Sequence, residues 1–255
     1  MTLLTARGGA ITSPAGGLPR AARVAEVVVE NARTRTLVLD AQVPAEPGQF
    51  AMLWLPGLDE KPFSLRDHDP LAFTVASVGP FSRALHRLEP GDPVWWRGPF
   101  GRGFRLSGAD HLLVGGGYGV APLLLLARRA LGLGQRVRIV IGARTGDDLA
   151  LVEATRSAGA EVVVTTDDGS AGRRGRVTDA VSEQLASDPP STLYACGPHA
   201  MLAALAAQAG AAGIAAQLSW EAYMRCAIGI CGSCEHHGLL LCADGPVLVS
   251  GVGTR

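Results

Sequence analysis

Four cysteines fall within seventeen residues near the end of this 255-residue chain: Cys226, Cys231, Cys234 and Cys242. A disulfide scaffold would spread its cysteines along a small chain, so this clustering indicates metal binding instead. The residues that carry the cysteines, 218–255, are too few to bury a core of their own, and a bound metal would stabilise them. We therefore expect a small C-terminal metal-binding segment at 218–255. The fifth cysteine, Cys196, stands apart.

The spacing of the four cysteines is C-x4-C-x2-C with a later cysteine, as in plant-type [2Fe–2S] ferredoxins. Soft thiolates suit iron–sulfur clusters, and Gly229 and Gly232 allow backbone N–H groups to turn towards the sulfurs. The spacing therefore predicts a two-iron cluster with all four cysteines as ligands.

Two alternatives remain open for this segment. A structural zinc site usually has two tight cysteine pairs, whereas only Cys231 and Cys234 form one here. His236 and His237 could each replace a cysteine as ligand, as in Rieske centres, but four thiolates already suffice. We expect both histidines to be solvated loop residues.

The composition argues against several classes of partner. Lys plus Arg equals Asp plus Glu at 23 each, so no net charge favours nucleic acid or an anionic membrane surface. The longest apolar runs are broken by Gly or Pro well short of a membrane span, and residues 1–19 lack a signal-peptide pattern. We expect a cytoplasmic protein of two domains, preceded by a flexible arm at 1–19.

The first half of the chain has the pattern of a β-barrel. Short apolar stretches separated by turn signals such as Glu46-Pro47-Gly48 indicate strands. The strands are expected at 24–29, 36–39, 50–55, 73–78 and 94–97, with one helix at 82–88. Short strands at near-regular spacing indicate a barrel or sandwich, and we place a barrel domain at 20–107.

After residue 108, strands and helices alternate. Strands are predicted at 111–114, 136–141, 161–165 and 192–195. Helices are predicted through residue 130, at 149–158 and from His199. Such alternation is typical of a parallel doubly wound α/β sheet, which we place at 108–217.

Three motifs in the barrel region are candidates for ligand binding. In Lys61-Pro62-Phe63-Ser64, a basic residue and a hydroxyl lie at an apparent strand edge. Val78-Gly79-Pro80-Phe81-Ser82 leads into the expected helix, whose free N–H groups would bind a pyrophosphate. A glycine-rich turn at 98–104 closes the region. Each motif alone also has a plain structural reading, as a solvated charge, an N-cap and a linker.

Two glycine turns of the α/β region are candidates for nucleotide binding. Gly115-Gly116-Gly117 follows a strand and opens a helix, which lets the backbone approach a pyrophosphate, although the run is not a strict G-x-G-x-x-G. Cys196-Gly197-Pro198 repeats this arrangement, so the two turns could face one crevice. Cys196 is either a thiol beside a nicotinamide or a buried small residue, and the sequence leaves both open. The turn at 166–170 is a further candidate.

In this order, the motifs resemble those of the ferredoxin-reductase-like family and, within it, the electron-transfer subunits of class 1B dihydroorotate dehydrogenases. The resemblance covers about 22–250. It rests on Pro47-Gly48-Gln49-Phe50, the motifs at 61–64, 98–101, 115–117 and 196–198, and the cysteine run followed by Asp244-Gly245-Pro246-Val247.

The resemblance implies three cofactors. FAD would bind the barrel domain, with Lys61, Pro62, Phe63 and Ser64 along the flavin and Gly79 and Ser82 at its pyrophosphate. NAD(H) would bind the α/β domain at Gly115, Gly116, Gly117, Cys196, Gly197 and Pro198. The four clustered cysteines would hold the [2Fe–2S] cluster between the flavin and a partner. The chain would be an oxidoreductase subunit that relays electrons.

The resemblance also implies a partner. In that family the partner subunit carries FMN and oxidises dihydroorotate to orotate in pyrimidine biosynthesis. Two copies of each subunit would form a heterotetramer. A subunit of a hydrogenase-type or glutamate-synthase-like NAD(P)H reductase is the alternative enzyme, and a zinc-stapled, non-catalytic scaffold is the alternative from another class.

Three features depart from the family pattern. Lys61 stands where related reductases commonly have arginine, and Ala227 where glycine is usual. Only seven residues separate Cys234 from Cys242, which makes a short loop.

The charged residues that follow the predicted strand at 136–141 indicate whether NADH or NADPH binds. Arg144 follows the strand that ends at residue 141 and could hold a 2′-phosphate, but Asp147 and Asp148 oppose an added negative charge. We expect NADH.

Overall fold

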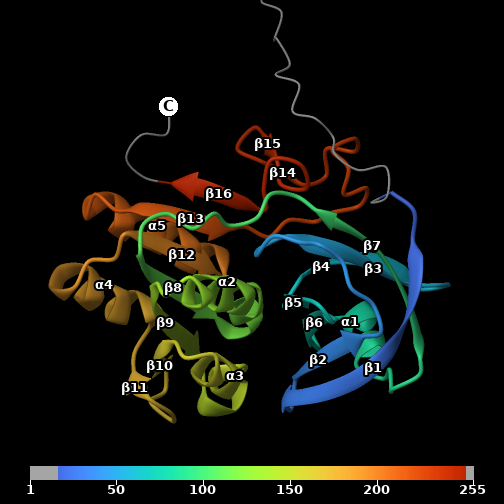
Figure 1. Ribbon diagram of the computed structural model, residues 1–255, viewed down its shortest axis with the longest axis horizontal. Helices are drawn as coiled ribbons and strands as arrows, with labels where there is room; N and C mark the ends of the chain where they lie inside the picture. The colour runs from blue at the N-terminus through green and yellow to red at the C-terminus, as the bar shows by residue number, and fades with distance from the viewer. Residues whose placement is uncertain (1–16, 251–255) are drawn as a thin grey trace, which may run out of the picture.

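Two domains lie side by side in the computed structural model, and the cysteine-bearing segment lies across the top of them (Figure 1). The structure describes residues 17–250. The predicted arm at 1–19 falls almost wholly outside the described residues, as do residues 251–255 of the predicted C-terminal segment. Within 17–250, none of the helices combines the length and the apolar character that crossing a bilayer requires.

The N-terminal domain is one antiparallel sheet rolled around an apolar core. Its strand order is β4-β3-β7-β1-β2-β6-β5. The strands are β1 (Arg20–Asn31), β2 (Thr34–Leu39), β3 (Phe50–Leu55), β4 (Asp59–Ser64), β5 (Asp67–His68), β6 (Leu71–Ala76) and β7 (Pro93–Phe100). The sheet curls far enough for β4 and β6, which do not pair, to contact each other. Leu37, Phe73 and Val94 are fully buried in the core that this curl encloses. All five predicted strands are present, β3 with the predicted ends and the other four with shifted ends, while β4 and β5 are additional.

Helix α1 (Pro80–Leu85) begins before the predicted start at Ser82 and ends before residue 88. Proline is favoured in the first helical turn because an N–H there has no intrahelical partner in any case. The hydroxyl of Ser82 accepts hydrogen bonds from the N–H groups of Val78 and Gly79, both at 2.9 Å. Ser82 is therefore inside the first turn rather than at the N-cap, and the predicted bounds were wrong.

The second domain is a doubly wound sheet, as predicted. Its strand order is β11-β10-β9-β8-β12-β13-β16, and every neighbouring pair is parallel except β13 with β16. The elements before β16 are β8 (Asp110–Gly116), the 3-10 helix η2 (Gly117–Val120), α2 (Ala121–Gly132), β9 (Arg136–Ala143), the 3-10 helix η3 (Gly146–Asp148), α3 (Val152–Ser157), β10 (Glu161–Thr166), β11 (Arg173–Arg174), α4 (Val177–Ser187), β12 (Thr192–Cys196), α5 (His199–Ala211) and β13 (Ala215–Ser219).

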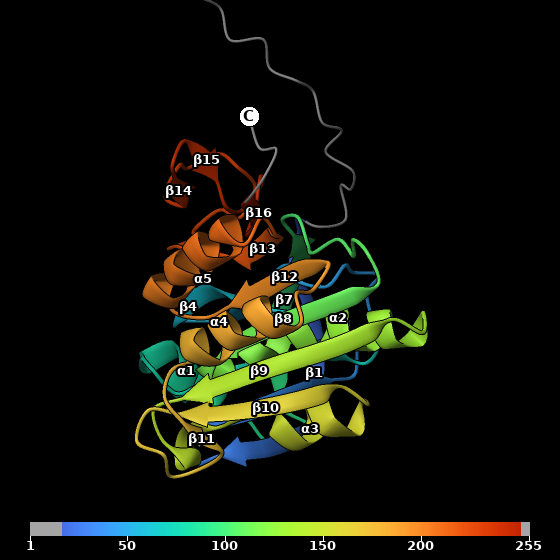
Figure 2. The same cartoon turned by 90° about the vertical axis from the view of Figure 1, so that its left-hand side faces the viewer.

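The helices of this domain cover both faces of its sheet. Successive side chains of a strand point to opposite faces, so Leu113 of β8 packs with α2 while Leu112 packs with α4 and α5. Figure 2 shows α4 and α5 over the face of the sheet that is turned towards the viewer. The order of β10, β9, β8, β12 and β13 reverses between β8 and β12, which is where ligands of such folds bind.

Three local predictions differ from the structure. The helix predicted at 149–158 is only α3, because Leu151 before it has a left-handed φ of 61°. Helix α4 was missed, although Val177, Ala180 and Val181 recur at helical spacing. Strand β13 was also missed, and it crosses the boundary that we expected after residue 217.

The cysteine-bearing segment packs on both domains. Its last strand, β16 (Val247–Ser250), pairs with β13 and so forms an edge of the α/β sheet. Its middle packs on the barrel, where Leu241 and Met224 share a buried cluster with Phe50 and Met52. The hairpin of β14 (Glu235–His236) and β15 (Leu239–Leu240) connects Cys234 to Cys242. The segment predicted as an appendage thus contributes to the cores of both domains.

Replacement of Leu241 by alanine tests this anchoring. Leu241 is fully buried, so Leu241→Ala should lower the free energy of unfolding by about 2–5 kcal/mol. Leu239 is 40% exposed in the same hairpin, and Leu239→Ala should change it by less than about 0.5 kcal/mol. Denaturant unfolding of the two purified variants measures both values. Equal losses would contradict the packing described here.

Candidate functional site

Two cavities adjoin each other where the barrel meets the α/β domain. The barrel cavity, about 740 Å³, is walled by β4, α1 and the residues just before the cysteines. The sheet cavity, about 750 Å³, lies at the carboxyl ends of β8, β9 and β10. Ala76, Val78, Tyr118 and Glu221 line both cavities. Each volume falls within the usual range for cofactor pockets.

The predicted residues of the barrel motifs come together at the barrel cavity: Lys61, Pro62, Phe63, Ser64, Gly79 and Ser82 all line it. Strand β4 is an end strand of its sheet, where a proline such as Pro62 is tolerated. Lys61 Nζ lies 2.8 Å from Asp59 Oδ2 and 4.8 Å from the centroid of the Tyr223 ring. The hydrogen bond to Asp59 raises the pKa of Lys61, so this wall of the cavity carries a stable cation.

Sequence reasoning missed a second wall of the barrel cavity. The residues between β13 and the first cysteine supply it, and those that line the cavity include Trp220, Glu221, Tyr223 and Met224. They form neither helix nor strand, so periodicity gave no signal. The available signal was the presence of two aromatic residues, Trp220 and Tyr223, shortly before Cys226.

The two predicted glycine turns abut at the sheet cavity. Gly116, Gly117, Gly197 and Pro198 line it. A Cβ on Gly116 would lie 2.8 Å from Pro198 Cδ, so glycine is needed where the turns meet. Gly115 does not line either cavity; a Cβ there would lie 2.5 Å from Val120, which indicates a packing role.

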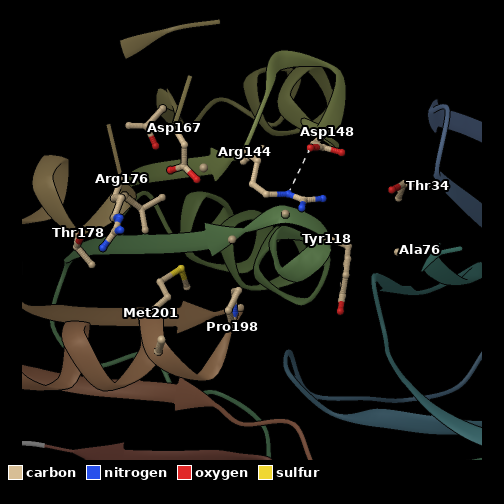
Figure 3. A pocket seen from close by; sticks show the side chains of 18 of the residues that line it. Thr34, Ala76, Tyr118, Arg144, Asp148, Asp167, Arg176, Thr178, Pro198 and Met201 are labelled. Atoms are coloured by element: carbon tan, nitrogen blue, oxygen red, sulfur yellow. Dashed lines mark ion pairs between the residues drawn. The ribbon is translucent and has the colours of Figure 1, made fainter. Parts of the chain in front are cut away.

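Charged and polar residues gather at the far end of the sheet cavity (Figure 3). Arg144 Nε lies 3.8 Å from Asp148 Oδ2, and Asp167 and Arg176 lie across from them. Thr165 is 1% exposed, and its Oγ1 has no hydrogen-bond partner among residues 17–250. A buried hydroxyl without a partner at a cavity wall suits a ligand that brings one.

Of the predicted turn at 166–170, only some residues face this cavity. Asp167 lines it, whereas Asp168 accepts hydrogen bonds from the backbone N–H and the hydroxyl of Ser170 at 2.9 and 2.6 Å. Asp168 therefore shapes the turn itself.

Tyr118, Cys196 and Glu221 lie close together where the two cavities adjoin. Burial raises the pKa of Cys196 to about 12, and the charge of Glu221 acts in the same direction. Burial also raises the pKa values of Glu221 and Tyr118. Cys196 is 3% exposed and lines the barrel cavity, so it is a buried residue whose thiol is protonated at neutral pH.

The clustered cysteines form two pairs. The Cys226 and Cys231 thiols interact with each other, and so do those of Cys234 and Cys242. Two pairs of thiols suit a two-iron cluster, in which each iron takes two cysteines.

Backbone N–H groups point at three of the cysteine sulfurs. Cys231 donates to Cys226 Sγ at 3.5 Å, Gly229 to Cys242 Sγ at 3.3 Å, and Cys242 to Cys234 Sγ at 3.4 Å. The loop reaches this arrangement through left-handed backbone at Ala227, Gly229 and Gly232, with φ of 60°, 79° and 72°. Ala227 thus adopts the conformation for which glycine is usual, so this departure from the family pattern leaves the loop geometry intact.

The environments of the cysteines shift their pKa values in opposite directions. Hydrogen bonding to the Ser233 hydroxyl lowers the pKa of Cys231 to about 6. Burial works to raise the pKa of Cys226, but the backbone N–H groups that face its sulfur outweigh this and lower it. Burial raises the pKa of Cys242 to about 12. The more exposed pair is therefore the one that favours thiolate.

Two family models match the chain. One, the oxidoreductase NAD-binding domain, matches residues 113–207. The other, the iron-sulfur cluster binding domain of dihydroorotate dehydrogenase B, matches residues 221–251.

Two curated proteins illustrate the similarity along most of the chain. A probable dihydroorotate dehydrogenase B (NAD(+)) electron transfer subunit from Thermococcus kodakarensis is 44% identical over 201 residues, which are 79% of this chain and 83% of that protein. The protein of the same description from Pyrococcus abyssi is 45% identical over 213 residues, 84% of this chain and 83% of that protein.

A solved structure of an NADH-dependent reduced ferredoxin-NADP oxidoreductase is also similar. Its TM-score is 0.81 at 28% identity, and the match covers 89% of this chain and 87% of that chain. The predicted fold class, a ferredoxin-reductase-like barrel with an α/β domain and an iron–sulfur segment, is confirmed.

Thiol labelling of protein prepared without iron tests the opposite pKa shifts. At pH 7, Cys231 is exposed and largely thiolate, whereas Cys196 is buried and protonated. Iodoacetamide should therefore modify Cys231 early and Cys196 last, as followed by peptide mass spectrometry. Ser233→Ala removes the hydroxyl that lowers the pKa of Cys231 and should slow its labelling while leaving Cys196 unchanged. Similar rates at Cys231 and Cys196 would contradict the assignment.

Proposed function

The chain belongs to the family of dihydroorotate dehydrogenase B electron transfer subunits, and on that basis we propose its reaction. It passes electrons between NAD(H), FAD and a [2Fe–2S] cluster, to or from an FMN-containing catalytic subunit that oxidises dihydroorotate. The observation that carries this proposal is the adjacency of three sites. The two cavities share Tyr118 and Glu221, while Trp220 and Met224 line the barrel cavity and also pack in the buried cluster that holds Cys234 and Cys242.

NAD(H) is assigned to the sheet cavity. Gly117 has open space around it, and it opens the path from β8 into η2 and α2, so a pyrophosphate can approach the backbone of the turn. The nicotinamide end would then reach Tyr118, where the cavities adjoin. Gly197 and Pro198 hold the opposite turn at this wall.

FAD is assigned to the barrel cavity. Lys61 supplies a cation for its phosphates or ring oxygens, and Ser64 supplies a hydroxyl on the same strand. Gly79 leaves open space at the start of α1. The flavin, when bound, supplies the exchange between two-electron hydride chemistry and one-electron transfer. Around it, the cavity is lined by Cys196, whose pKa burial raises, and by Trp220.

The cluster is assigned to the two cysteine pairs, with Cys226 and Cys231 on one iron and Cys234 and Cys242 on the other. The inward N–H groups of Gly229, Cys231 and Cys242 stabilise the negative charge on the sulfurs.

NADH is the nucleotide that the charges favour. Asp148 lies 3.8 Å from Arg144, the guanidinium considered for a 2′-phosphate, and partly neutralises it. Asp167 and Arg176 line the same end of the cavity. The two carboxylates there offset the two guanidinium groups, so no surplus positive charge favours a 2′-phosphate.

The partner subunit is proposed to bind over the cysteine loop. Ile228 and Ile230 are 50% and 79% exposed, and they flank the cluster ligands. Large apolar side chains exposed together are typical of a protein–protein interface. We expect two copies of each subunit in the complex, and a cytoplasmic location, where thiols remain reduced.

Cofactor analysis of the anaerobically purified protein tests the function. We expect one FAD, about two irons and about two acid-labile sulfides per chain. Reduction of the bound flavin should proceed with NADH at a much lower concentration than with NADPH. Co-expression with the catalytic subunit should give a complex that links dihydroorotate oxidation to NAD reduction. One zinc without flavin would refute the proposal.

A charge at the proposed partner surface should weaken the complex. Ile230→Glu places a carboxylate in an interface that excludes water, and we expect the dissociation constant for the catalytic subunit to rise at least about tenfold. Leu133→Glu is the control, because Leu133 is 65% exposed at the end of α2, away from the cysteines. Calorimetry measures both, and the iron content of each variant checks that the cluster is retained. Unchanged binding by Ile230→Glu would exclude this surface.

A further inference from the structure

Arg97 is a buried cation with no place in the sites described so far. It lies on β7, is 8% exposed, and stacks its guanidinium 5.2 Å from the Phe100 ring centroid. Removing a charge from water is costly. A buried arginine is therefore stable only where hydrogen bonds and an ion pair satisfy its N–H groups. The barrel core itself needs no charge here.

The partners of Arg97 come from two different parts of the chain. Its Nε and Nη2 donate to both carboxylate oxygens of Glu60, at 2.6 and 2.7 Å, in a bidentate ion pair. Its Nη1 donates to the carbonyl oxygen of Cys226 at 2.9 Å. The guanidinium thus ties β4, next to Lys61 of the flavin wall, to the main chain of the first cysteine ligand.

This juxtaposition has an electrostatic consequence. One-electron reduction makes an iron–sulfur cluster more negative, so a nearby positive charge stabilises the reduced form and a nearby negative charge destabilises it. Arg97 is buried and Glu60 is half-buried, so solvent screens these charges less than it would at the surface. Arg97 donates a hydrogen bond to the main chain of Cys226, which carries a ligand sulfur. Glu60 binds a different part of the guanidinium and has no such contact with Cys226.

We propose that Arg97 positions Cys226 and raises the reduction potential of the cluster, and that Glu60 limits this rise. The inference deepens the proposed function and rests on the cluster that it assigns to the cysteines. Arg97 is a positioning residue, because it acts through the main chain of Cys226 and the field of its charge.

The two charges predict opposite effects, which a loss of structure would not produce. Glu60→Gln keeps the size and a hydrogen-bond acceptor but removes the negative charge, so the midpoint potential of the cluster should rise. Arg97→Met removes the positive charge with a similar apolar volume, so the potential should fall. Arg97→Lys keeps the charge without the fork geometry and should lie between Arg97→Met and the unmodified protein. Redox titration followed by electron paramagnetic resonance of the reduced cluster measures each value.

Arg138→Met is the matched control. Arg138 is 5% exposed and binds both carboxylate oxygens of Asp110, at 3.0 and 3.1 Å, within the α/β domain. Its loss should leave the potential of the cluster unchanged. The iron, sulfide and flavin content of every variant is measured beside the titration.

The possible results distinguish a failure of this inference from a failure of the proposed function. Absence of iron from the unmodified protein would refute the proposed function itself. With the cluster present, no shift in either charge variant, or shifts in the same direction, would overturn the inference. If Arg97→Met loses its cluster, Glu60→Gln decides the matter, and a potential that does not rise would overturn the inference.

Discussion

The packing of residues 220–250 across both domains is the contact on which the remaining architecture depends. At one end β16 adds an antiparallel strand to β13, and in the middle Leu241 fills a pocket against Met52. Between these anchors, Trp220 and Tyr223 close a wall of the barrel cavity. The segment has little regular secondary structure of its own, yet it joins the barrel to the α/β domain.

A close contact between the backbones of Gly119 and Cys196 determines where the two cavities meet. A side chain at Gly119 would overlap the carbonyl of Cys196, so η2 and the end of β12 are in direct contact. Because β8 and β12 are neighbours at the reversal of the strand order, both glycine turns emerge beside each other. Tyr118 is carried by the first turn and faces both cavities. Sheet topology thus places the nucleotide and flavin sites next to each other.

The local signals in the sequence predicted much of the fold and the cysteine segment. The cysteine spacing, the glycine turns and the alternation of strands with helices are properties of short stretches, so they can be read without a structure. The start of α1 was predicted at Ser82, but the helix begins at Pro80, in keeping with the preference of proline for the first turn. Contacts between distant residues could not be predicted. Arg97 and Cys226 are 129 residues apart, and neither lies in a pattern that points to the other.

The pairing of β16 with β13 also bears on how the protein is made. The cysteine loop lies between these two strands in the chain, and the second of them leaves the ribosome after all four cysteines. Until then, β13 is an unpaired edge, and the loop is anchored only by β13 and by the packing of Leu241 and Met224 on the barrel. The last anchor of the loop therefore forms only after all four cysteines have been synthesised.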